Sequence, residues 1–286
     1  MKRQRITILP YIQRKENTMK KILAVLSAAA LCLSLCSCKK KDLTDWEYIQ
    51  DKGTLVAGIT YYEPMNYLDE NGELTGFETE FTKAVCEKLG VKAEFQVIEW
   101  DKKEVELKSK AIDAIWNGLT VTEDRKENMA FSTPYVRNKQ VVVINKANAD
   151  KYTDIASMAG ASITAEGGSA GQDAIEGNDV LSQNPFVASS AQKDVLMEVL
   201  SKTTEIGVID YVMAKASIGE GTDYADLMIV DGVELTPEEY AIGLRLEDTE
   251  TLAKINGAID EMVKDGSLLR LCEKYGLADT YAFIEE

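Results

Sequence analysis

The residues best suited to chemistry lie together in the stretch GLTVTEDR, residues 118–125. Thr120 and Glu123 have the spacing of a capping box, so we expect a short helix to begin here, after the apolar stretch AIDAIW. The first backbone N–H groups of a helix have no helical partner, and the helix dipole favours negative charge near them. Arg125 and the hydroxyls of Thr120 and Thr122 add further donors. The stretch is a candidate site for a small anion such as a carboxylate, or else an ordinary helix start with a solvated arginine.

Several kinds of catalytic site are excluded by composition. The sequence contains no histidine, which removes Ser-His and Cys-His catalysis as well as histidine-ligated metals. No glycine-rich phosphate-binding motif of the Walker or dinucleotide type occurs. These absences argue against an enzyme that uses such groups, and we expect no metal and no cofactor.

The elements that must position these residues alternate between strand and helix, which is typical of an α/β fold. A helix is expected in FETEFTKAVCEKLG, where Phe77, Phe81, Val85 and Leu89 form one apolar stripe. A second helix should begin after Ser169. The strands are expected in TLVAGIT, AEFQVIEW, AIDAIWNGLT, KQVVVINK, ASITAEGG, EIGVIDY, ADLMIV and YAIGLRL.

A pair of helices is expected near the C-terminus. In the first, Leu252, Ile255, Ile259 and Met262 keep helical spacing. Asp-Gly then separates the two helices, and we expect Ser267 to cap the second.

The N-terminal sequence has the layout of a secretory signal. From Met19 it runs through two lysines and an apolar stretch to LCSC. This tail resembles a bacterial lipobox, so we expect cleavage after residue 37 and lipidation, for example with palmitate, at Cys38. Residues 1–18 precede a better start at Met19, where we expect translation to begin. Residues 38–45 would form a short linker to a lipid anchor on the bacterial cell membrane.

The expected mature chain is strongly acidic. It contains 25 basic and 47 acidic residues, a formal charge of about −22. Such a surface repels nucleic acid and anionic headgroups, so we expect neither as a partner. Besides the lipidated Cys38, two cysteines remain, Cys86 and Cys272, either as a disulfide or as thiols partly buried in two helices.

Several motifs in one order resemble the family 3 solute-binding proteins, the polar amino-acid-binding proteins of bacterial ABC importers. The resemblance covers the chain from about Trp46 to the C-terminus. It implies an α/β, two-lobed periplasmic-binding-protein fold of type II, with lobe 1 at 46–136 and 236–286 and lobe 2 at 137–235. Two crossover strands, near Tyr135–Lys139 and Ile229–Leu235, would join the lobes around a ligand cleft. The motifs are YYEPMNYLDENGELTGFETEF, KAIDAIWNGLTVTEDRKENMAFSTPY, EGGSAG, VID and YAIGLRLEDTETLAKINGAIDEMVKDGSLLRLCEKYG.

The resemblance also implies a clamp for one amino acid. Arg125 would grip the α-carboxylate as a bidentate partner. Its neighbours in the motif NGLT would contribute as well: the residues are Asn117, the backbone carbonyl of Gly118 for the ammonium, and the hydroxyl of Thr120.

The second lobe would supply the other half of the clamp. By the same resemblance, Ser169 and the N–H of Ala170 approach the carboxylate, and Asp210 holds the α-ammonium. From the residues alone, Ser169 could instead be only a helix cap, and Asp210 a solvated strand end.

The choice of amino acid depends on positions around the ligand side chain. Tyr62 and Trp100 match family positions that pack against it, although both could equally be half-buried core. Family members that bind cationic amino acids have an acid where this chain has Ile59. Glu166 matches a position that often faces the ligand side chain and would repel an acidic one. A neutral polar or sulfur-containing amino acid is therefore favoured.

We thus expect a monomeric, extracytoplasmic receptor that delivers an amino acid to a membrane ABC permease. Two alternatives remain open on the same fold. One is a dehydratase-like enzyme acting on cyclic acids. The other is a ligand-sensing domain, although such domains are normally fused to membrane or catalytic segments.

Overall fold

The computed structural model describes residues 43–283 of the chain. The predicted leader at 1–37 and the lipidation site Cys38 lie outside the described residues. Of the predicted linker at 38–45, the structure describes the last three residues. Its final residue begins a helix, α2 (Asp45–Lys52), and the Asp45 carboxylate accepts hydrogen bonds from the N–H groups of Glu250 and Thr251 at 2.7 and 2.8 Å.

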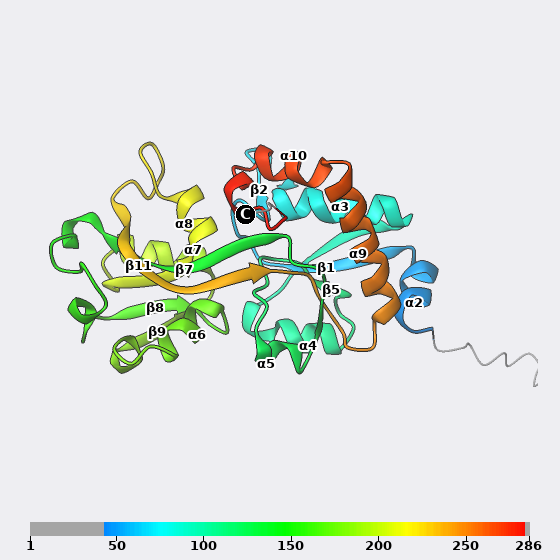
Figure 1. Ribbon diagram of the computed structural model, residues 1–286. Helices are drawn as coiled ribbons and strands as arrows, with labels where there is room; N and C mark the ends of the chain where they lie inside the picture. The colour runs from blue at the N-terminus through cyan, green and yellow to red at the C-terminus, as the bar shows by residue number, and fades with distance from the viewer. Residues whose placement is uncertain (1–42, 284–286) are drawn as a thin grey trace, which may run out of the picture. The chain divides into compact units, whose positions relative to one another are not determined.

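Two mixed five-stranded sheets form the frame of the protein (Figure 1). The first has the order β4-β1-β5-β12-β6, in which β1 pairs in parallel with both β4 and β5. Its strands are β1 (Thr54–Ile59), β4 (Lys92–Val97), β5 (Ala114–Ile115), β6 (Ala130–Phe131) and β12 (Gly243–Leu244). Around it lie α2, α3 (Phe77–Leu89), α4 (Lys103–Lys108), α5 (Glu123–Lys126), α9 (Thr249–Lys264), α10 (Ser267–Lys274) and the small hairpin β2 (Tyr67–Leu68) and β3 (Leu74–Thr75).

The second sheet has the order β11-β7-β10-β8-β9. Helices α6, α7 and α8 pack against its strands. The strands are β7 (Val136–Asn145), β8 (Ile163–Glu166), β9 (Phe186–Ser189), β10 (Ile206–Asp210) and β11 (Leu227–Tyr240). The helices are α6 (Ala170–Glu176), α7 (Gln192–Leu200) and α8 (Tyr211–Ser217). Single turns of 3-10 helix lie at Trp100–Lys102 (η1), Lys146–Asn148 (η2), Ala156–Met158 (η3), Leu181–Gln183 (η4) and Ala278–Thr280 (η5).

Strands β7 and β11 connect the two sheets (Figure 1). They are antiparallel, and Val136 pairs with Tyr240 at the end nearer the first sheet. Tyr240 also forms an isolated bridge with Thr120. The register shifts on both sides of Glu234. The chain therefore leaves the first half of the molecule along β7 and returns to it along β11.

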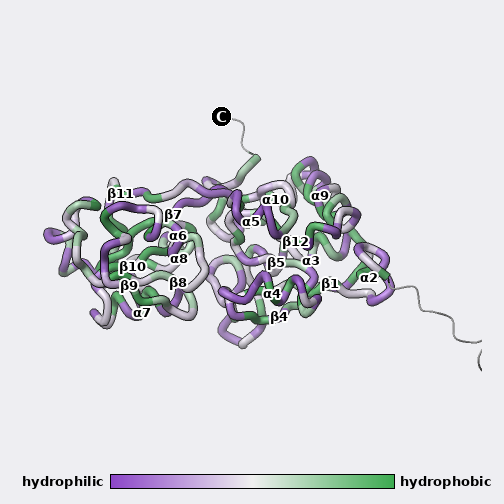
Figure 2. The backbone as a smooth tube through the Cα atoms, turned by 90° about the horizontal axis from the view of Figure 1, so that it is seen from below, coloured by the Kyte–Doolittle hydropathy of each residue, from purple (hydrophilic) through white to green (hydrophobic). Residues whose placement is uncertain are grey.

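The predicted helical stripes are confirmed as core contacts. Phe77, Phe81 and Val85 of α3 are fully buried, and the Phe81 ring meets Trp116 edge-on at 5.3 Å between centroids. In Figure 2, α9 alternates between hydrophobic and hydrophilic residues, as its one buried face requires. Both remaining cysteines are buried as free thiols, Cys86 in α3 and Cys272 in α10, so the disulfide alternative is wrong.

Other expectations about the elements need correction. Gly266, with φ of +74°, occupies the cap position of α10, and Ser267 is the first helical residue, so Ser267 does not cap it. The strands expected in AIDAIWNGLT and YAIGLRL are much shorter in the structure: β5 and β12 have two residues each, and Tyr240 belongs to the end of β11. Other apolar residues of these stretches, such as Trp116 and Ile242, are buried in loops. Strand β9 was not expected, since only Ser189 of its four residues is buried.

Candidate functional site

A buried cavity lies between the two halves, and nine of the ten predicted ligand-binding residues line it. Its volume is about 10 Å³, which is room for about one water molecule. The tenth predicted residue, Tyr62, lies just behind the wall, and Gln192 was not predicted. The lining residues are Trp100, Asn117, Gly118, Thr120, Arg125, Glu166, Ser169, Ala170, Gln192 and Asp210.

Helix α5 begins two residues later than the capping-box spacing predicts. Thr122 is its cap, and the Thr122 hydroxyl accepts a hydrogen bond from the N–H of Arg125 at 3.2 Å. The prediction that Thr120 is the cap is wrong, because Thr120 still belongs to the extended chain that bridges to Tyr240. Its hydroxyl instead donates to Glu238 at 3.1 Å.

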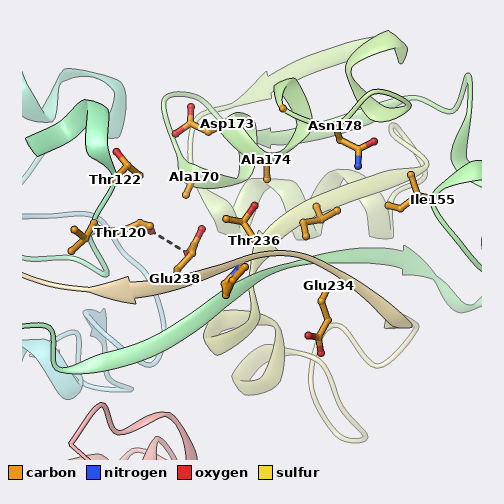
Figure 3. A pocket seen from close by; sticks show the side chains of 14 residues that line it. Thr120, Thr122, Ile155, Ala170, Asp173, Ala174, Asn178, Glu234, Thr236 and Glu238 are labelled. Carbon is orange, nitrogen blue, oxygen red and sulfur yellow. Dashed lines mark hydrogen bonds between the residues drawn. The ribbon is translucent and has the colours of Figure 1, made fainter.

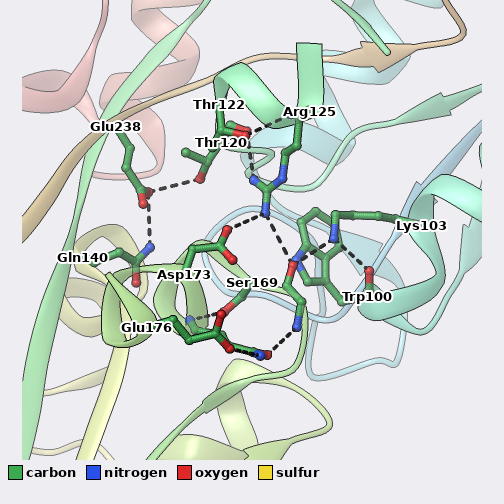
Figure 4. Close-up of polar contacts among 12 residues, drawn as sticks. Trp100, Lys103, Thr120, Thr122, Arg125, Gln140, Ser169, Asp173, Glu176 and Glu238 are labelled. Atoms are coloured by element: carbon green, nitrogen blue, oxygen red, sulfur yellow. Dashed lines mark hydrogen bonds and ion pairs between the residues drawn. The ribbon is translucent and has the colours of Figure 1, made fainter. Parts of the chain in front are cut away.

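Arg125 is 7% exposed and points into the cavity region (Figure 4). Its guanidinium donates to the carbonyl of Thr120 at 2.9 Å and to that of Gly168, in the other half, at 3.4 Å. Asp173 of α6 lies 3.6 Å from the same guanidinium. Arg125 is therefore a buried cation, whereas the Asp173 side chain that pairs with it is 60% exposed. The alternative that Arg125 is a solvated arginine is wrong.

Ser169 serves as the cap of α6, as the alternative expectation stated. Its hydroxyl accepts from the N–H of Gln172 at 3.2 Å. Ser169 and Ala170 nevertheless both line the cavity. The positive φ of Gly168, +68°, lets the backbone turn from β8 into α6 at this point.

Asp210 is buried at the end of β10 and is not a solvated strand end. The Tyr240 hydroxyl and the Gln140 amide donate to its Oδ1 at 2.6 and 2.9 Å. The side-chain amides of Asn138 and Gln192 also donate to the carboxylate. Burial raises the pKa of Asp210, while these four hydrogen bonds work against the rise.

Glu238 is a buried acid that sequence reasoning missed. Its Oε2 accepts from Thr120 and also from the same two amides, of Asn138 and Gln140, that serve Asp210. Its Oε1 has no hydrogen-bond partner. Burial, followed by the charge of Asp210, raises the pKa of Glu238 to about 8. The surrounding sequence TPEEY offers no periodic pattern that would single out this glutamate.

Buried hydrogen bonds hold the backbone of Gly118 and the side chain of Asn117 in place. The N–H of Gly118 donates to Glu78 at 2.8 Å, and the Asn117 side chain donates to Thr60 at 2.7 Å. Burial raises the pKa of Glu78 to about 7. Gly118 has a φ of +57°, and an added Cβ would lie 2.6 Å from the Tyr62 ring, so only glycine fits.

The two predicted aromatic residues have different positions. Trp100 lines the cavity, and the Lys103 ammonium lies 4.8 Å from its ring centroid. Tyr62 is buried behind Gly118, and its hydroxyl lies 2.7 Å from that of Tyr240. Glu166, at the end of β8, lines the cavity with an unpartnered Oε1.

A wider groove of about 360 Å³ adjoins the cavity and shares Thr120 and Ala170 with it (Figure 3). Asp173, Glu234 and Glu238 line it, and its lining residues include no basic side chain. The groove therefore attracts cations rather than anions. Among the residues that line the groove and the cavity, Arg125 is the one whose guanidinium can bind a carboxylate.

Within residues 43–283, no helix has both the length and the apolar character needed to cross a bilayer. In the same range, no three side chains of histidine, cysteine, aspartate or glutamate are grouped closely enough to hold a metal ion.

Two α/β halves joined by paired strands, with a buried charged cavity between them, are the architecture of type II periplasmic binding proteins. Residues 55–278 match the bacterial extracellular solute-binding proteins, family 3, and the chain belongs to that family. The family and fold expected from the sequence motifs are therefore confirmed.

Individual relatives are binding proteins. The chain is 29% identical over 234 residues to the L-cystine-binding protein TcyJ of Escherichia coli, covering 81% of this chain and 85% of that one. It is similar to a substrate-binding protein of an ABC uptake transporter from Streptococcus pneumoniae with bound histidine (TM-score 0.75, 30% identity, 83% and 98% covered). Another similar structure is an ancestral amino acid-binding protein described as a precursor of cyclohexadienyl dehydratase (TM-score 0.73, 28% identity, 80% and 97% covered).

Proposed function

We propose that the protein is the substrate-binding receptor of an ABC importer, which captures a free L-amino acid outside the cell and delivers it to a membrane permease. The observation that carries this proposal is that Arg125, from the half with the first sheet, and Asp210, from the second sheet, line one cavity. A free amino acid is a zwitterion, and its two charges need opposite charges and hydrogen bonds when they leave water. A bound amino acid would bridge both halves and favour their closure.

The proposed lobes are 46–136 with 236–286, and 137–235. Lys139 pairs with Pro237 and Val136 with Tyr240, which supports a first crossover near Tyr135–Lys139 and places the second strand opposite it at 237–240, after the expected Ile229–Leu235. In this assignment the three clamp residues Asn117, Gly118 and Thr120 come from lobe 1 with Arg125, and Ser169 and Ala170 come from lobe 2 with Asp210.

The ligand we propose is a neutral polar or sulfur-containing amino acid. The Escherichia coli relative is named for L-cystine, which is sulfur-containing, while the Streptococcus pneumoniae protein holds histidine. Ile59, at the position where cationic binders have an acid, is buried and apolar in β1.

We further propose that the receptor is monomeric and attached to the outside of the cell membrane through a lipid, such as palmitate, on Cys38. Growing cells should incorporate radiolabelled palmitate into the protein. The variant Cys38→Ser should not be labelled and should be released into the medium. Equal labelling of both forms would exclude Cys38 as the site.

The first test is a thermal-shift screen of refolded, ligand-stripped protein, residues 39–286, against the free amino acids and a few cyclic acids. One or a few L-amino acids should raise the melting temperature selectively, because a ligand that binds only the folded state stabilises it by mass action. No shift with any amino acid would contradict the receptor function. Turnover of a prephenate-like acid would instead support the dehydratase alternative, which the ancestral structural relative makes worth including.

A further inference from the structure

Two buried carboxyl groups on different strands share the same hydrogen-bond donors. Asp210 ends β10 and Glu238 lies in β11, and they are 5% and 7% exposed. The side-chain amide of Asn138 donates to both carboxyl groups. The amide of Gln140 does the same, at 2.9 Å to Asp210 Oδ1 and 3.2 Å to Glu238 Oε2 (Figure 4). Both acids therefore lie within hydrogen-bond distance of the same two amide groups and away from bulk water.

The donors that contact this pair are neutral. Thr120 donates to Glu238 at 3.1 Å, and Tyr240 donates to Asp210 at 2.6 Å. Neutral donors stabilise one anion, but they do not cancel the repulsion between two carboxylates in a buried site. Within the described residues, Glu238 Oε1 and Gln140 Oε1 have no hydrogen-bond partner, and a proton on the carboxyl pair supplies a donor. The contacts therefore favour a state in which the pair holds one proton.

Other ionisable groups near the pair are either engaged elsewhere or acidic. Arg125 of α5 is the cation among the cavity-lining residues, and its guanidinium binds the carbonyl of Thr120, whose hydroxyl binds Glu238. The same guanidinium pairs with Asp173 of α6 and donates to Gly168. Further neighbours carry carboxyl or phenol groups: Tyr62 after β1, Glu78 of α3, Glu166 of β8, and Glu234 and Tyr240 of β11. A bound proton is therefore the positive charge that the pair can hold in the ligand-free protein.

The pKa values of the two acids agree with this arrangement. Burial, followed by the charge of Asp210, raises the pKa of Glu238 to about 8. Burial also raises the pKa of Asp210, while hydrogen bonds from four side chains oppose the rise. Because these bonds favour ionised Asp210, at neutral pH the proton resides on Glu238 and the negative charge on Asp210. Asp210 is thereby ready to receive a ligand ammonium.

We propose that Asp210 and Glu238 hold one proton between them in the ligand-free protein, and that capture of the ligand α-ammonium by Asp210 releases this proton to solvent. The ammonium brings to the pair the positive charge that the proton supplied before. Glu238 is then a positioning residue, which acts on the ligand through Asp210 and makes amino-acid capture depend on pH. The wider groove, which Glu238 also lines, gives the proton a route to solvent (Figure 3). This inference rests on the proposed amino-acid receptor function.

The direction of the pH dependence follows from the released proton. Because a proton leaves when the ligand binds, a low pH opposes binding and affinity rises with pH. The rise continues up to the pKa of the ligand-free pair, which for Glu238 is about 8. Release of one full proton corresponds to about a tenfold change in affinity per pH unit.

Isothermal titration of the ligand-stripped protein in buffers of different ionisation enthalpy counts the released protons. The probes are L-glutamine and L-methionine, or the amino acid with the largest thermal shift if neither binds. At pH 7, wild type should release about one proton for each ligand bound. Its Kd should fall at least about tenfold between pH 5.5 and 7.5.

The variants separate proton release from a purely structural role. Glu238→Gln keeps the size of the side chain and an acceptor for Thr120, but an amide has no proton to release. Its Kd should change less than about threefold over the same range, with no proton released. Glu238→Asp keeps an ionisable group and should still release a proton. Glu239→Gln is the matched control, since Glu239 is the exposed next residue of β11, and it should show the wild-type pH dependence.

The outcomes are distinguishable. If wild type releases no proton, or if Glu238→Gln releases as many as wild type, the inference is wrong and the receptor function stands. If Glu238→Gln does not fold, Glu166→Gln decides, because Glu166 is another buried acid that interacts with Asp210 and has a raised pKa. Retained proton release in Glu166→Gln supports the inference, and lost release overturns it. If no free amino acid binds, the receptor function fails and the inference fails with it.

Discussion

Arg125 and Asp210 line the same cavity, yet each is held by other groups. Arg125 contacts two carbonyls and Asp173, whereas Asp210 accepts only from neutral donors. A ligand carboxylate can replace Asp173 at the guanidinium, because Asp173 is largely exposed and returns readily to water. A ligand ammonium would supply the cation that the Asp210 network lacks.

Removing the guanidinium should abolish tight binding. Arg125→Ala would leave the ligand carboxylate buried without its charge partner, a loss of roughly 3–5 kcal/mol, or at least about a hundredfold in Kd. Isothermal titration with the ligand found in the thermal screen measures this loss of affinity. Lys126→Ala is the control, since Lys126 is the exposed next residue and pairs with Glu123. Binding by Arg125→Ala within a few-fold of wild type would show that the clamp is elsewhere.

The role of the Asp210 carboxylate can be tested with an isosteric substitution. Asp210→Asn keeps the size of the side chain but removes the charge opposite the ligand ammonium, so affinity should fall at least about a hundredfold. A circular-dichroism melt must show that the variant is folded, because Asp210 also holds four donors in place. Asp194→Asn, an exposed acid in the first turn of α7, should bind as wild type does. Unchanged affinity in Asp210→Asn would argue against its role.

The sequence predicted the charged clamp residues better than their surroundings. Arg125 and Asp210 each lie in a short sequence motif of the family, so the resemblance was enough to predict both residues. Lys103, Gln192 and Glu238 lie in three separated segments, and each contacts its partner, Gly168, Asp210 and Gln140 respectively, only because the chain folds. Exposed and buried lysines look alike in a charged stretch such as DKKEVELK, so sequence could not distinguish Lys103 from its neighbours.

Among the elements, the longest helices were predictable and the shortest strands were not. The buried face of α9 repeats over four turns, which gives a clear periodic signal. Strands β5 and β12 have two residues each, too few for any period to show. They form because Gly243 pairs with both Ile115 and Phe131 from distant parts of the chain.

The corrected caps give a prediction about stability. Thr122→Ala should lower the free energy of unfolding by about 1 kcal/mol, because the Arg125 N–H loses its acceptor. This corresponds to about 2–4 °C in melting temperature for a domain of this size. Ser267→Ala is the comparison: its hydroxyl makes no cap bond and donates only at 3.4 Å to the carbonyl of Met262, so the melting temperature of this variant should stay within about 1 °C of wild type. Equal losses in both variants would contradict the assignment of the caps.

At the scale of the whole molecule, the two halves are closed on each other. Lys103 and Arg125 of one half both donate to Gly168 of the other, and the cavity holds about 10 Å³. An amino acid can enter only if these contacts open first. These two contacts are polar, so a ligand that links the same halves through Arg125 and Asp210 would replace them and stabilise the closed arrangement.

Buried acids make the stability of the ligand-free molecule depend on pH. Burial raises the pKa of Glu78 to about 7 and of Glu166 and Glu238 to about 8, from an ordinary value near 4.5. Between pH 5 and 8 the folded state therefore holds protons that the unfolded state has released. Because the folded state binds more protons, its stability falls as pH rises through this window. Acids with lowered pKa, such as Glu80 and Glu205, have their effect below it.

Melting curves of ligand-stripped protein should therefore show a melting temperature several degrees lower at pH 8 than at pH 5.5, since each kcal/mol is worth about 2–4 °C. Glu166→Gln and Glu238→Gln should each flatten the dependence, because an amide cannot release the proton that the buried acid loses. Glu123→Gln, at the exposed start of α5, should keep the wild-type slope. A melting temperature that rises with pH across this window would mean that these carboxyl groups are ionised in the folded protein, held by partners other than those described above.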